Sequence, residues 1–371
     1  MVAKGGFPVT DTLVSIGLLA AERGALSDAA VRFGIRRLCA ARLRQEARRA
    51  GSSRLAAVPE SDPVAPAPEA ANRQHYELPA AFFEKVLGPS VKYSCCYWEH
   101  PDSTLPEAEV AALHSTCSRA EIEDGQDVLE LGCGWGSAAL WIAQRYRRCT
   151  ITAVTNSRSQ QGFIMARAAR LGLDNLRVLK ADMNEFGIRE RFDRVISIEM
   201  FEHMRNHAEL MRRIAGWLKP GGKLFVHIFC HRQFAYEFEA AGPSNWVGRH
   251  FFTGGLMPSK DLLSTCQDHL ELHRQWRWRG IHYQRTALAW LENLDRERSD
   301  VLQIFRQVYG DDEAELWFAR WRIFFMACAE LWGYRRGTEW HVAHYLFGKP
   351  PAAHVADLGP SAGESSARAD P

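Results

Sequence analysis

The sequence lacks several features that would place it in a familiar class. No uncharged apolar run approaches the ~20 residues that a membrane-spanning helix needs, and the polar Asp11 interrupts an only mildly apolar start, so no signal peptide is expected. Its nine cysteines are scattered without a CxxC pair, which argues against a disulfide framework or a zinc site and favours the reducing cytoplasm. Neither charge dominates: Lys and Arg number 46 against 44 for Asp and Glu, unlike a dedicated nucleic-acid-binding protein.

What the sequence does contain predicts one large domain with additions. It has 371 residues, of which 46% are hydrophobic, enough for a sizeable core. Residues 1–50 are predicted to form a helical extension, and residues 51–72 form a Pro/Ala-rich linker. The second predicted helix, within 28–50, is rich in arginine. Its basic face suits either solvent or an anionic membrane surface.

From residue 73 to 349, strand and helix patterns alternate. Strands are predicted within "QDVLELGCGWG", "CTITAVTNS", "LRVLKADM", "FDRVISIEMF" and "GKLFVHIFCH", and helical patterns separate most of them. Such alternation predicts a doubly wound, mostly parallel, Rossmann-like sheet of the α/β class. Residues 285–346 are predicted to form a helical cap over the ligand edge of the sheet, and residues 350–371 to form a disordered tail.

A glycine-rich turn follows the first of these strands. Glu130 lies near the strand end, and Gly132, Gly134 and Gly136 alternate after it. Glycines let the backbone bend sharply and approach a ligand, and the helix that follows offers free N–H groups. The GxGxG spacing differs from the dinucleotide fingerprint GxGxxG. Because a carboxylate repels a pyrophosphate, Glu130 favours a ligand with cationic groups, such as S-adenosylmethionine.

Two further strand ends offer groups for the same ligand. Thr155, Asn156 and Gln160 stand where many nucleotide-binding proteins offer an acid to the ribose. After the third strand, Asp182 is expected either to accept the adenine amino group or to cap a helix, and Met183 to line the ring. The carboxyl ends of parallel strands meet at one edge of the sheet, so these residues are expected to lie together.

These motifs resemble a known family. From His75 to Lys349 the chain resembles the cyclopropane-fatty-acid-synthase-like group of class I S-adenosylmethionine-dependent methyltransferases. The segments that carry the resemblance are "HYELPAAFFEKVLGPSVKYSCCYW", "VLELGCGWGS", "AVTNSRSQ", "MFEHM", "LKPGG" and "HYQRTALAW". It implies a class I methyltransferase sheet with a helical cap, and it assigns Tyr93 and Ser94 to the methionine part of the donor. A domain that only binds the donor, or acts as a scaffold, is a further alternative.

Two branches of this group differ in the acceptor of the methyl group. "TNSRSQ", "FEHMRNH" and "WRIFFMACAELWGYRRGTEWHVAHYLF" most resemble the coclaurine N-methyltransferase-like branch, which methylates amine nitrogens. In that branch, the residues matching Glu199, Glu202 and His203 are implicated in catalysis. An amine must lose a proton before its lone pair can attack, so we expect Glu202 and His203 to handle protons and Glu199 to orient the acceptor.

The other branch methylates the double bonds of lipid acyl chains with the help of a bound bicarbonate. The resemblance implies that Cys95, Glu202, His227 and Tyr283 would hold that ion, although burial alone also explains Cys95 and His227. Tryptophans and phenylalanines in the cap are expected mostly in the core, and one or two could hold a cationic amine. The predicted partners are an amine or a lipid acyl chain, a second copy of this chain and a membrane surface, but no nucleic acid and no metal.

Overall fold

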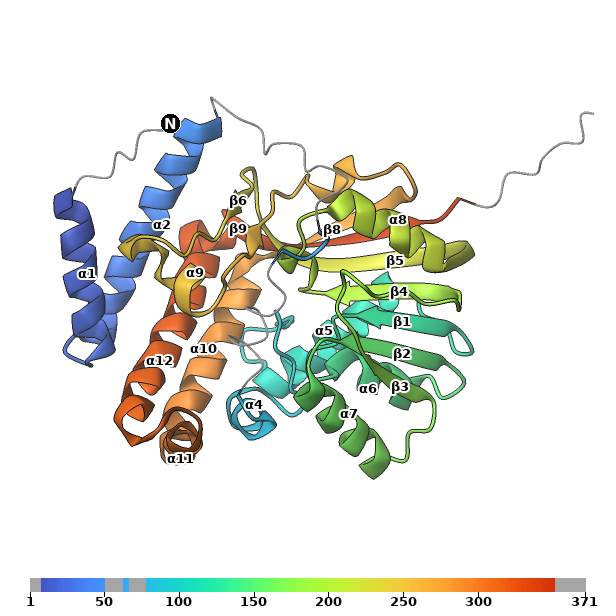
Figure 1. The fold of residues 1–371 in the computed structure, drawn as a ribbon, viewed down its shortest axis with the longest axis horizontal. Helices are drawn as coiled ribbons and strands as arrows, with labels where there is room; N and C mark the ends of the chain where they lie inside the picture. Colours follow the sequence, from blue (N-terminus) through green and yellow to red (C-terminus); the bar gives the residue numbers. More distant parts are fainter. Residues whose placement is uncertain (1–7, 51–62, 67–77, 351–371) are drawn as a thin grey trace, which may run out of the picture.

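The computed structural model describes residues 8–50, 63–66 and 78–350. Its centre is a seven-stranded sheet with the strand order β3-β2-β1-β4-β5-β9-β8 (Figure 1). The strands span β1 Asp127–Leu131, β2 Thr150–Thr155, β3 Leu176–Lys180, β4 Phe192–Ile198, β5 Leu218–His231, β8 Glu271–Arg279 and β9 Trp340–Gly348. Strands β1 to β5 run parallel, and β9 runs antiparallel to both of its neighbours. The expected α/β sheet of the class I methyltransferase type is confirmed.

Helices cover both faces of this sheet. They are α5 Leu105–Arg119, α6 Ser137–Arg145, α7 Arg158–Arg170 and α8 His207–Trp217. Alternate side chains of one strand serve opposite faces: Val128 packs with the α5–α7 side, whereas Leu129 packs with α8. Helix α5 begins with a capping box in which Thr104 and Glu107 satisfy each other's backbone N–H groups.

A second layer of helices lies beside the sheet (Figure 1). It contains α4 Ala80–Val86, α9 Trp246–His250, α10 Gly280–Arg296, α11 Arg298–Tyr309 and α12 Asp311–Gly333. The first two helices, α1 Pro8–Glu22 and α2 Asp28–Ala50, lie outside α12, where Arg32 and Arg36 of α2 form ion pairs with Glu330. A short ribbon of β6 Tyr236–Glu237 and β7 Leu256–Met257 completes the fold.

The helical cap ends earlier than the sequence predicts. Helix α12 stops at Gly333, and residues 340–348 form β9 in the interior of the sheet. All nine residues of β9 are buried, so the strand lacks the alternation of apolar and polar side chains that marks a half-exposed strand. A fully buried strand of this kind, in which only His341 and His344 interrupt the apolar residues, cannot be distinguished from a buried helix by its periodicity.

Part of the predicted linker is also docked on the domain. Val64 and Ala65 are 2% and 4% exposed, which is unlike a solvated linker. The remaining linker predictions, the start of the resemblance at His75 and the predicted tail from 351 onward lie outside the described residues. Within the described part of the chain, no helix combines the length and apolar character needed to cross a bilayer.

Candidate active site

A cavity of about 740 Å³, counting its open mouth, lies at the carboxyl ends of the parallel strands. We call it the glycine-turn cavity. Its walls come from the turn after β1, the ends of β2, β3 and β4, and a distant loop: Ala65, Gly132, Gly134, Val154, Thr155, Asn156, Gln160, Ala181, Met183, Glu199, Met200, His203, Met204, Thr253 and Gly254. The sequence-predicted strand ends therefore do meet at one place.

The three glycines of the turn serve two different purposes. All have positive φ, at 73°, 52° and 81° for Gly132, Gly134 and Gly136. A Cβ on Gly132 would lie 2.8 Å from the Met200 side chain, and one on Gly136 would lie 2.6 Å from that of Ile164. Gly134 instead has nothing within 4 Å and lines the cavity. The first and third glycines allow close packing, and the second leaves room for a ligand.

Glu130 supports this turn from behind. The residue is 2% exposed, it does not line the cavity, and burial raises the pKa of its carboxyl to about 8. A hydrogen bond from the backbone of Ala139, in the first turn of α6, acts in the opposite direction. The sequence favours contact of Glu130 with a cationic ligand, but its position behind the turn places it against the backbone of α6 instead.

The end of β2 places an unsatisfied donor beside the cavity. The Thr155 hydroxyl donates to Gln160 Oε1 at 2.5 Å, which leaves the Gln160 Nε2 group without a hydrogen-bond partner among the described residues. Gln160 is only 1% exposed, and both residues line the cavity together with Asn156. A buried unpaired N–H group is costly, so it fits a ligand with acceptor oxygens, such as the hydroxyls of a ribose.

At the end of β3, the two predicted residues separate. Met183 lines the cavity, whereas Asp182 Oδ1 accepts the Asn184 N–H at 2.8 Å and so caps a turn. Asn184 in turn holds residues 63–66, which we call the strap, so that Ala65 lines the cavity. Its side chain makes two 2.9 Å hydrogen bonds to the backbone of Ala65, and the Arg205 N–H donates to the Val64 carbonyl at 2.7 Å. Nothing in the Pro/Ala-rich composition of the strap predicts this contact.

A second cavity, of about 760 Å³, adjoins the first. We call it the aromatic cavity. Its lining is mostly apolar and comes from β5, the 238–257 region, α10 and α12: Tyr93, Glu199, His203, Phe229, Phe238, Val247, Phe252, Met257, Tyr283, Trp290, Phe324, Cys328, Leu331 and Trp332. Glu199 and His203 line both cavities. Tyr93 thus belongs to the aromatic cavity, while Ser94 lies outside both and accepts a 2.6 Å hydrogen bond from Lys92.

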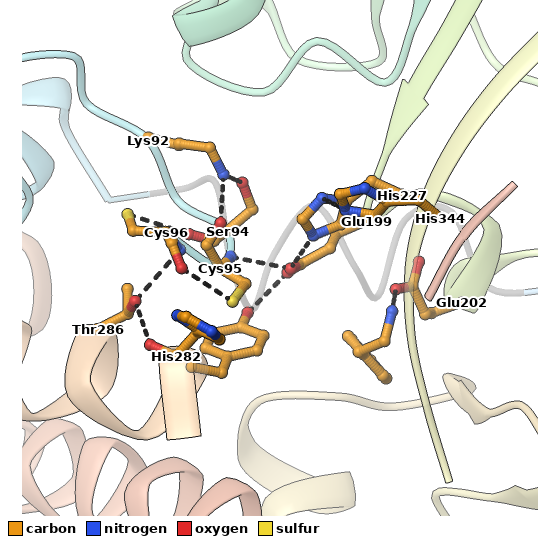
Figure 2. A network of polar contacts seen from close by, with 12 residues as sticks. Lys92, Ser94, Cys95, Cys96, Glu199, Glu202, His227, His282, Thr286 and His344 are labelled. Carbon is orange, nitrogen blue, oxygen red and sulfur yellow. Dashed lines mark hydrogen bonds and ion pairs between the residues drawn. The ribbon is translucent and has the colours of Figure 1, made fainter. Parts of the chain in front are cut away.

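Glu199 is held in an unusual conformation between these cavities. It directly follows β4 with a left-handed φ of 51°, which is uncommon for a residue with a side chain and is often found at functional sites. Its side chain is 9% exposed. Oε1 accepts hydrogen bonds from the Cys95 backbone at 2.9 Å and from His227 Nε2 at 3.1 Å, and Oε2 accepts one from the Tyr283 hydroxyl at 2.6 Å (Figure 2).

These donors oppose the effect of burial on the Glu199 carboxyl. Burial raises its pKa above the ordinary value, while the Lys92 charge and the hydrogen bonds from Cys95 and Tyr283 act in the opposite direction. Donors to the charged form favour ionisation. The result is a carboxylate with a raised proton affinity.

His203 and Glu202 differ sharply in their surroundings. His203 lies between the two cavities, and burial lowers the pKa of its imidazole to about 4, so the ring is neutral at pH 7. Glu202 is fully buried, lines neither cavity and accepts the Phe229 N–H at 2.7 Å. Burial and the nearby Glu199 raise the pKa of Glu202 well above its usual range. Glu202 is therefore shielded from both cavities, unlike its neighbours Glu199 and His203.

The four residues expected around a bicarbonate also meet differently. Cys95, His227 and Tyr283 converge on the carboxylate of Glu199 rather than on Glu202 (Figure 2). The Cys95 thiol points to the Cys96 carbonyl at 3.3 Å, and burial raises its pKa well above the usual value. A glutamate side chain therefore receives the hydrogen bonds that the resemblance assigns to an ion.

Together, the strand order, the glycine turn and the unpaired donor define a class of protein, the class I methyltransferases. These enzymes use S-adenosylmethionine, which supplies an electrophilic methyl group on its sulfonium. Gly134 and the Gln160 amide fit that donor, because one leaves space and the other lacks a hydrogen-bond acceptor in the described structure.

Comparison with known proteins narrows the class to a family. The family model described as mycolic acid cyclopropane synthetase matches residues 66–338, and the chain belongs to this family. (S)-Coclaurine N-methyltransferase of Thalictrum flavum subsp. glaucum is 38% identical over 285 residues, which cover 76% of this chain and 79% of the relative. Cyclopropane-fatty-acyl-phospholipid synthase of Escherichia coli K12 is 30% identical over 59% of this chain and 55% of its own length.

A solved structure extends the match to the fold. A crystal structure of coclaurine N-methyltransferase bound to N-methylheliamine and SAH has a TM-score of 0.83 at 34% identity, and the match covers 90% of this chain and 98% of that one. The resemblance expected from the sequence is confirmed. The protein is an S-adenosylmethionine-dependent methyltransferase.

Proposed function

We propose that the enzyme transfers the methyl group to the nitrogen of a small amine that binds in the aromatic cavity. The observation that carries the proposal is the position of Glu199. Its carboxylate is the acidic group at the junction of the two cavities, and the walls around the acceptor side are aromatic. The amine-specific relatives agree with this choice.

The aromatic cavity suits a cation with an apolar body. An aliphatic amine is protonated at neutral pH, and burying its charge costs free energy unless an opposite charge or an aromatic face compensates. Glu199 supplies the opposite charge, and rings such as Trp332 and Phe252 supply the faces. A volume near 760 Å³, including the open mouth, lies in the usual range for small-molecule sites.

Glu199 is the proposed proton acceptor. The ammonium first donates a hydrogen bond to the carboxylate and then gives up a proton to it, which frees the nitrogen lone pair for attack. A raised carboxyl pKa brings Glu199 closer to that of the amine and makes the transfer less unfavourable. His203, neutral and adjacent, orients the amine. Glu202 has a different role in this proposal: its protonated carboxyl supports the backbone of β5.

The lipid alternative conflicts with the contacts of Glu199. Three of the four expected bicarbonate ligands already donate hydrogen bonds to the Glu199 carboxylate. His227 and Tyr283 donate through their side chains, and Cys95 donates through its backbone N–H. A bicarbonate at the same donors would place a second anion against this carboxylate in a buried site, where like charges repel strongly. An amine acceptor avoids this conflict, because it brings a positive charge.

A two-substrate assay tests the proposal. The enzyme is incubated with donor labelled in its methyl group and with either a tetrahydroisoquinoline amine or vesicles of unsaturated phospholipid, each with and without bicarbonate. We expect label in the amine, independent of bicarbonate, and its loss in Glu199→Gln. Label in the lipid that requires bicarbonate would overturn the amine assignment and support the lipid alternative.

The predicted location and assembly belong to this proposal as well. Nine free thiols agree with the cytoplasm. The basic helix α2 forms ion pairs within the chain through Arg32, Arg36, Arg42 and Arg49, and these pairs reduce the positive charge available to a membrane. The exposed apolar row on α1, with Leu13 at 65% and Ile16 at 59%, favours a second copy of the chain. Sedimentation and vesicle flotation distinguish a homodimer from peripheral membrane binding.

A further inference from the structure

A row of buried rings connects Glu199 to an arginine at the end of α5. His227 Nε2 bonds to Glu199 Oε1 at 3.1 Å, and His227 Nδ1 lies 2.9 Å from His344 Nε2 (Figure 2). His344 Nδ1 lies 2.6 Å from Arg119 Nη1. Both histidines are fully buried. The family resemblance indicates His227, whereas no sequence pattern indicates His344 or Arg119.

The register of the sheet builds this row. His227 in β5 is directly opposite His344 in β9, and His344 is directly opposite Trp276 in β8. Arg119 ends α5 and lies over the rings of Trp276 and Trp278, with centroid distances of 5.3 and 5.4 Å. These cation–π contacts hold the guanidinium against the outer end of the row.

The chemistry of arginine gives the row a direction. A guanidinium only donates hydrogen bonds, so His344 Nδ1 must accept. Burial lowers the pKa of both histidines well below the ordinary value, so both rings are neutral and each carries one N–H. His344 then carries its proton on Nε2 and donates to His227, and His227 carries its own on Nε2 and donates to Glu199. The tautomers follow from the network and from the donor-only nature of Arg119.

We propose that Arg119 is a positioning residue for methyl transfer: acting through His344 and His227, it keeps the ring of His227 a hydrogen-bond donor to Glu199. This inference rests on the proposed role of Glu199 as the proton acceptor. Arg119 thus fixes the direction of the hydrogen bonds in the row, and the two neutral rings transmit this direction to the Glu199 carboxylate. Arg119 itself stays outside both cavities, so no extra positive charge faces the sulfonium or the ammonium.

Reversing the direction of the hydrogen bonds in the row would change the pKa of the Glu199 carboxyl. Without Arg119, His344 can carry its proton on Nδ1, and His227 then turns its Nε2 lone pair toward Glu199. A lone pair facing a carboxylate is unfavourable unless the carboxyl is protonated, so Glu199 would hold its proton to higher pH. Other groups near Glu199 stay the same in this comparison: Lys92, Cys95, Glu202, His203, Tyr283 and Cys328.

Four single variants and one double variant test the proposal. Arg119→Met removes the donor, Arg119→Lys keeps a cationic donor, and His344→Phe breaks the row without changing its charge. The matched control is Arg194→Met, because Arg194 is a similarly half-buried arginine that bonds to the backbone of Ala120 and Glu121 near the end of the same helix. Each purified full-length variant is first checked for folding by circular dichroism and for donor binding by calorimetry.

The activity readout is the pH profile of kcat with the amine that serves as substrate. In Arg119→Met we expect the acid limb to move up by about one pH unit, so that kcat on that limb falls about tenfold while the KM for the donor stays unchanged. Arg119→Lys should restore most of the profile. The double variant of Arg119→Met with His344→Phe should have the same pH profile of kcat as His344→Phe alone, because Arg119 acts through that ring.

A second readout needs no acceptor. In protein labelled with ¹⁵N-histidine, the shifts of ring nitrogens distinguish protonated from unprotonated atoms, and we expect both buried rings as Nε2–H tautomers in the parent protein and a changed tautomer in Arg119→Met. Unchanged tautomers and an unchanged pH profile in Arg119→Met, or an equal shift in Arg194→Met, would overturn the inference. If Arg119→Met does not fold, His344→Phe and the tautomers of the parent protein decide it. A tautomer change without any amine methylation would leave the row intact and reject the proposed function instead.

Discussion

The two cavities that meet at Glu199 have similar volumes, about 740 and 760 Å³, but are built in different ways. The glycine-turn cavity lies at the ends of parallel strands, and its lining includes Gly132, Gly134 and Glu199, which have positive φ angles that few residues with side chains adopt. The aromatic cavity is formed by side chains from distant elements. Positions with a positive φ resist substitution, whereas the side chains that line the aromatic cavity can be exchanged. Relatives that are named for amines and for phospholipids fit this difference.

The largest expected effect comes from the residue that the cavities share. In Glu199→Gln the side chain keeps its shape but loses the charge that receives the proton. We expect kcat to fall about 10²–10⁴-fold, the range usual for general acid–base groups, while calorimetry shows donor binding close to that of the parent protein. The matched control is Glu121→Gln, since Glu121 also has a left-handed φ, of 54°, but pairs with Lys223 away from both cavities. A large loss of donor binding in Glu199→Gln would contradict the separation of the two cavities.

The next largest effect is expected on donor binding in the glycine-turn cavity. Gly132→Ala places a Cβ 2.8 Å from Met200 at a φ of 73°. Strain of this kind costs about 1–3 kcal/mol, so we expect the donor to bind about tenfold more weakly, or worse, in calorimetry. Gly125→Ala is the control, because Gly125 has a φ of 96° but open space around it before β1. Equal donor affinity in the two variants would show that the turn is not the donor site.

The same difference explains what the sequence could predict. The glycine turn, the strand ends and the parallel order of β1 to β5 follow from local patterns and from the rule that parallel strands end at one edge. No local sequence pattern predicts the contacts of Glu199, because its partners Cys95, His227 and Tyr283 lie 104, 28 and 84 positions away. Only the family resemblance indicated these three residues, and it grouped them with Glu202.

Long-range pairing also explains the remaining errors. The predicted helical cap, 285–346, overlaps most of strand β9 (Trp340–Gly348), because a strand buried on both faces has no alternating pattern. No local pattern predicts the contacts of Arg119 and His344, since only the antiparallel pairing of β5 with β9 brings His344 beside His227. The strap at Ala65 has no signal in its composition, and its place depends on the side chain of Asn184.

A smaller effect is expected from the strap, which adds a side-chain-dependent wall to the glycine-turn cavity. Asn184→Ala removes two hydrogen bonds to Ala65. With about 0.5–1.5 kcal/mol per bond, and because the strap can still pack, we expect donor affinity to fall about threefold to tenfold in calorimetry. Asn175→Ala is the control: Asn175 bonds to the backbone of Ala143, Tyr146 and Cys149 far from the cavities, so it should lower the melting temperature without changing donor affinity. Unchanged affinity in Asn184→Ala would remove the strap from the site.

The smallest effect on activity is expected at Glu202, and it sharpens the contrast with Glu199. Because burial and Glu199 raise the Glu202 pKa well above 4.5, the folded protein keeps this carboxyl protonated where the unfolded chain ionises it. The folded state therefore binds more protons, and this group's contribution makes stability fall as pH rises above about 4.5. Glu202→Gln imitates the neutral acid, so kcat should stay within about twofold of the parent value. Between pH 5 and pH 8, the melting temperature of Glu202→Gln should therefore rise relative to that of the parent protein. A kcat loss as large as that of Glu199→Gln would instead return Glu202 to the proton path and show that the cavities do not separate the two carboxyl groups.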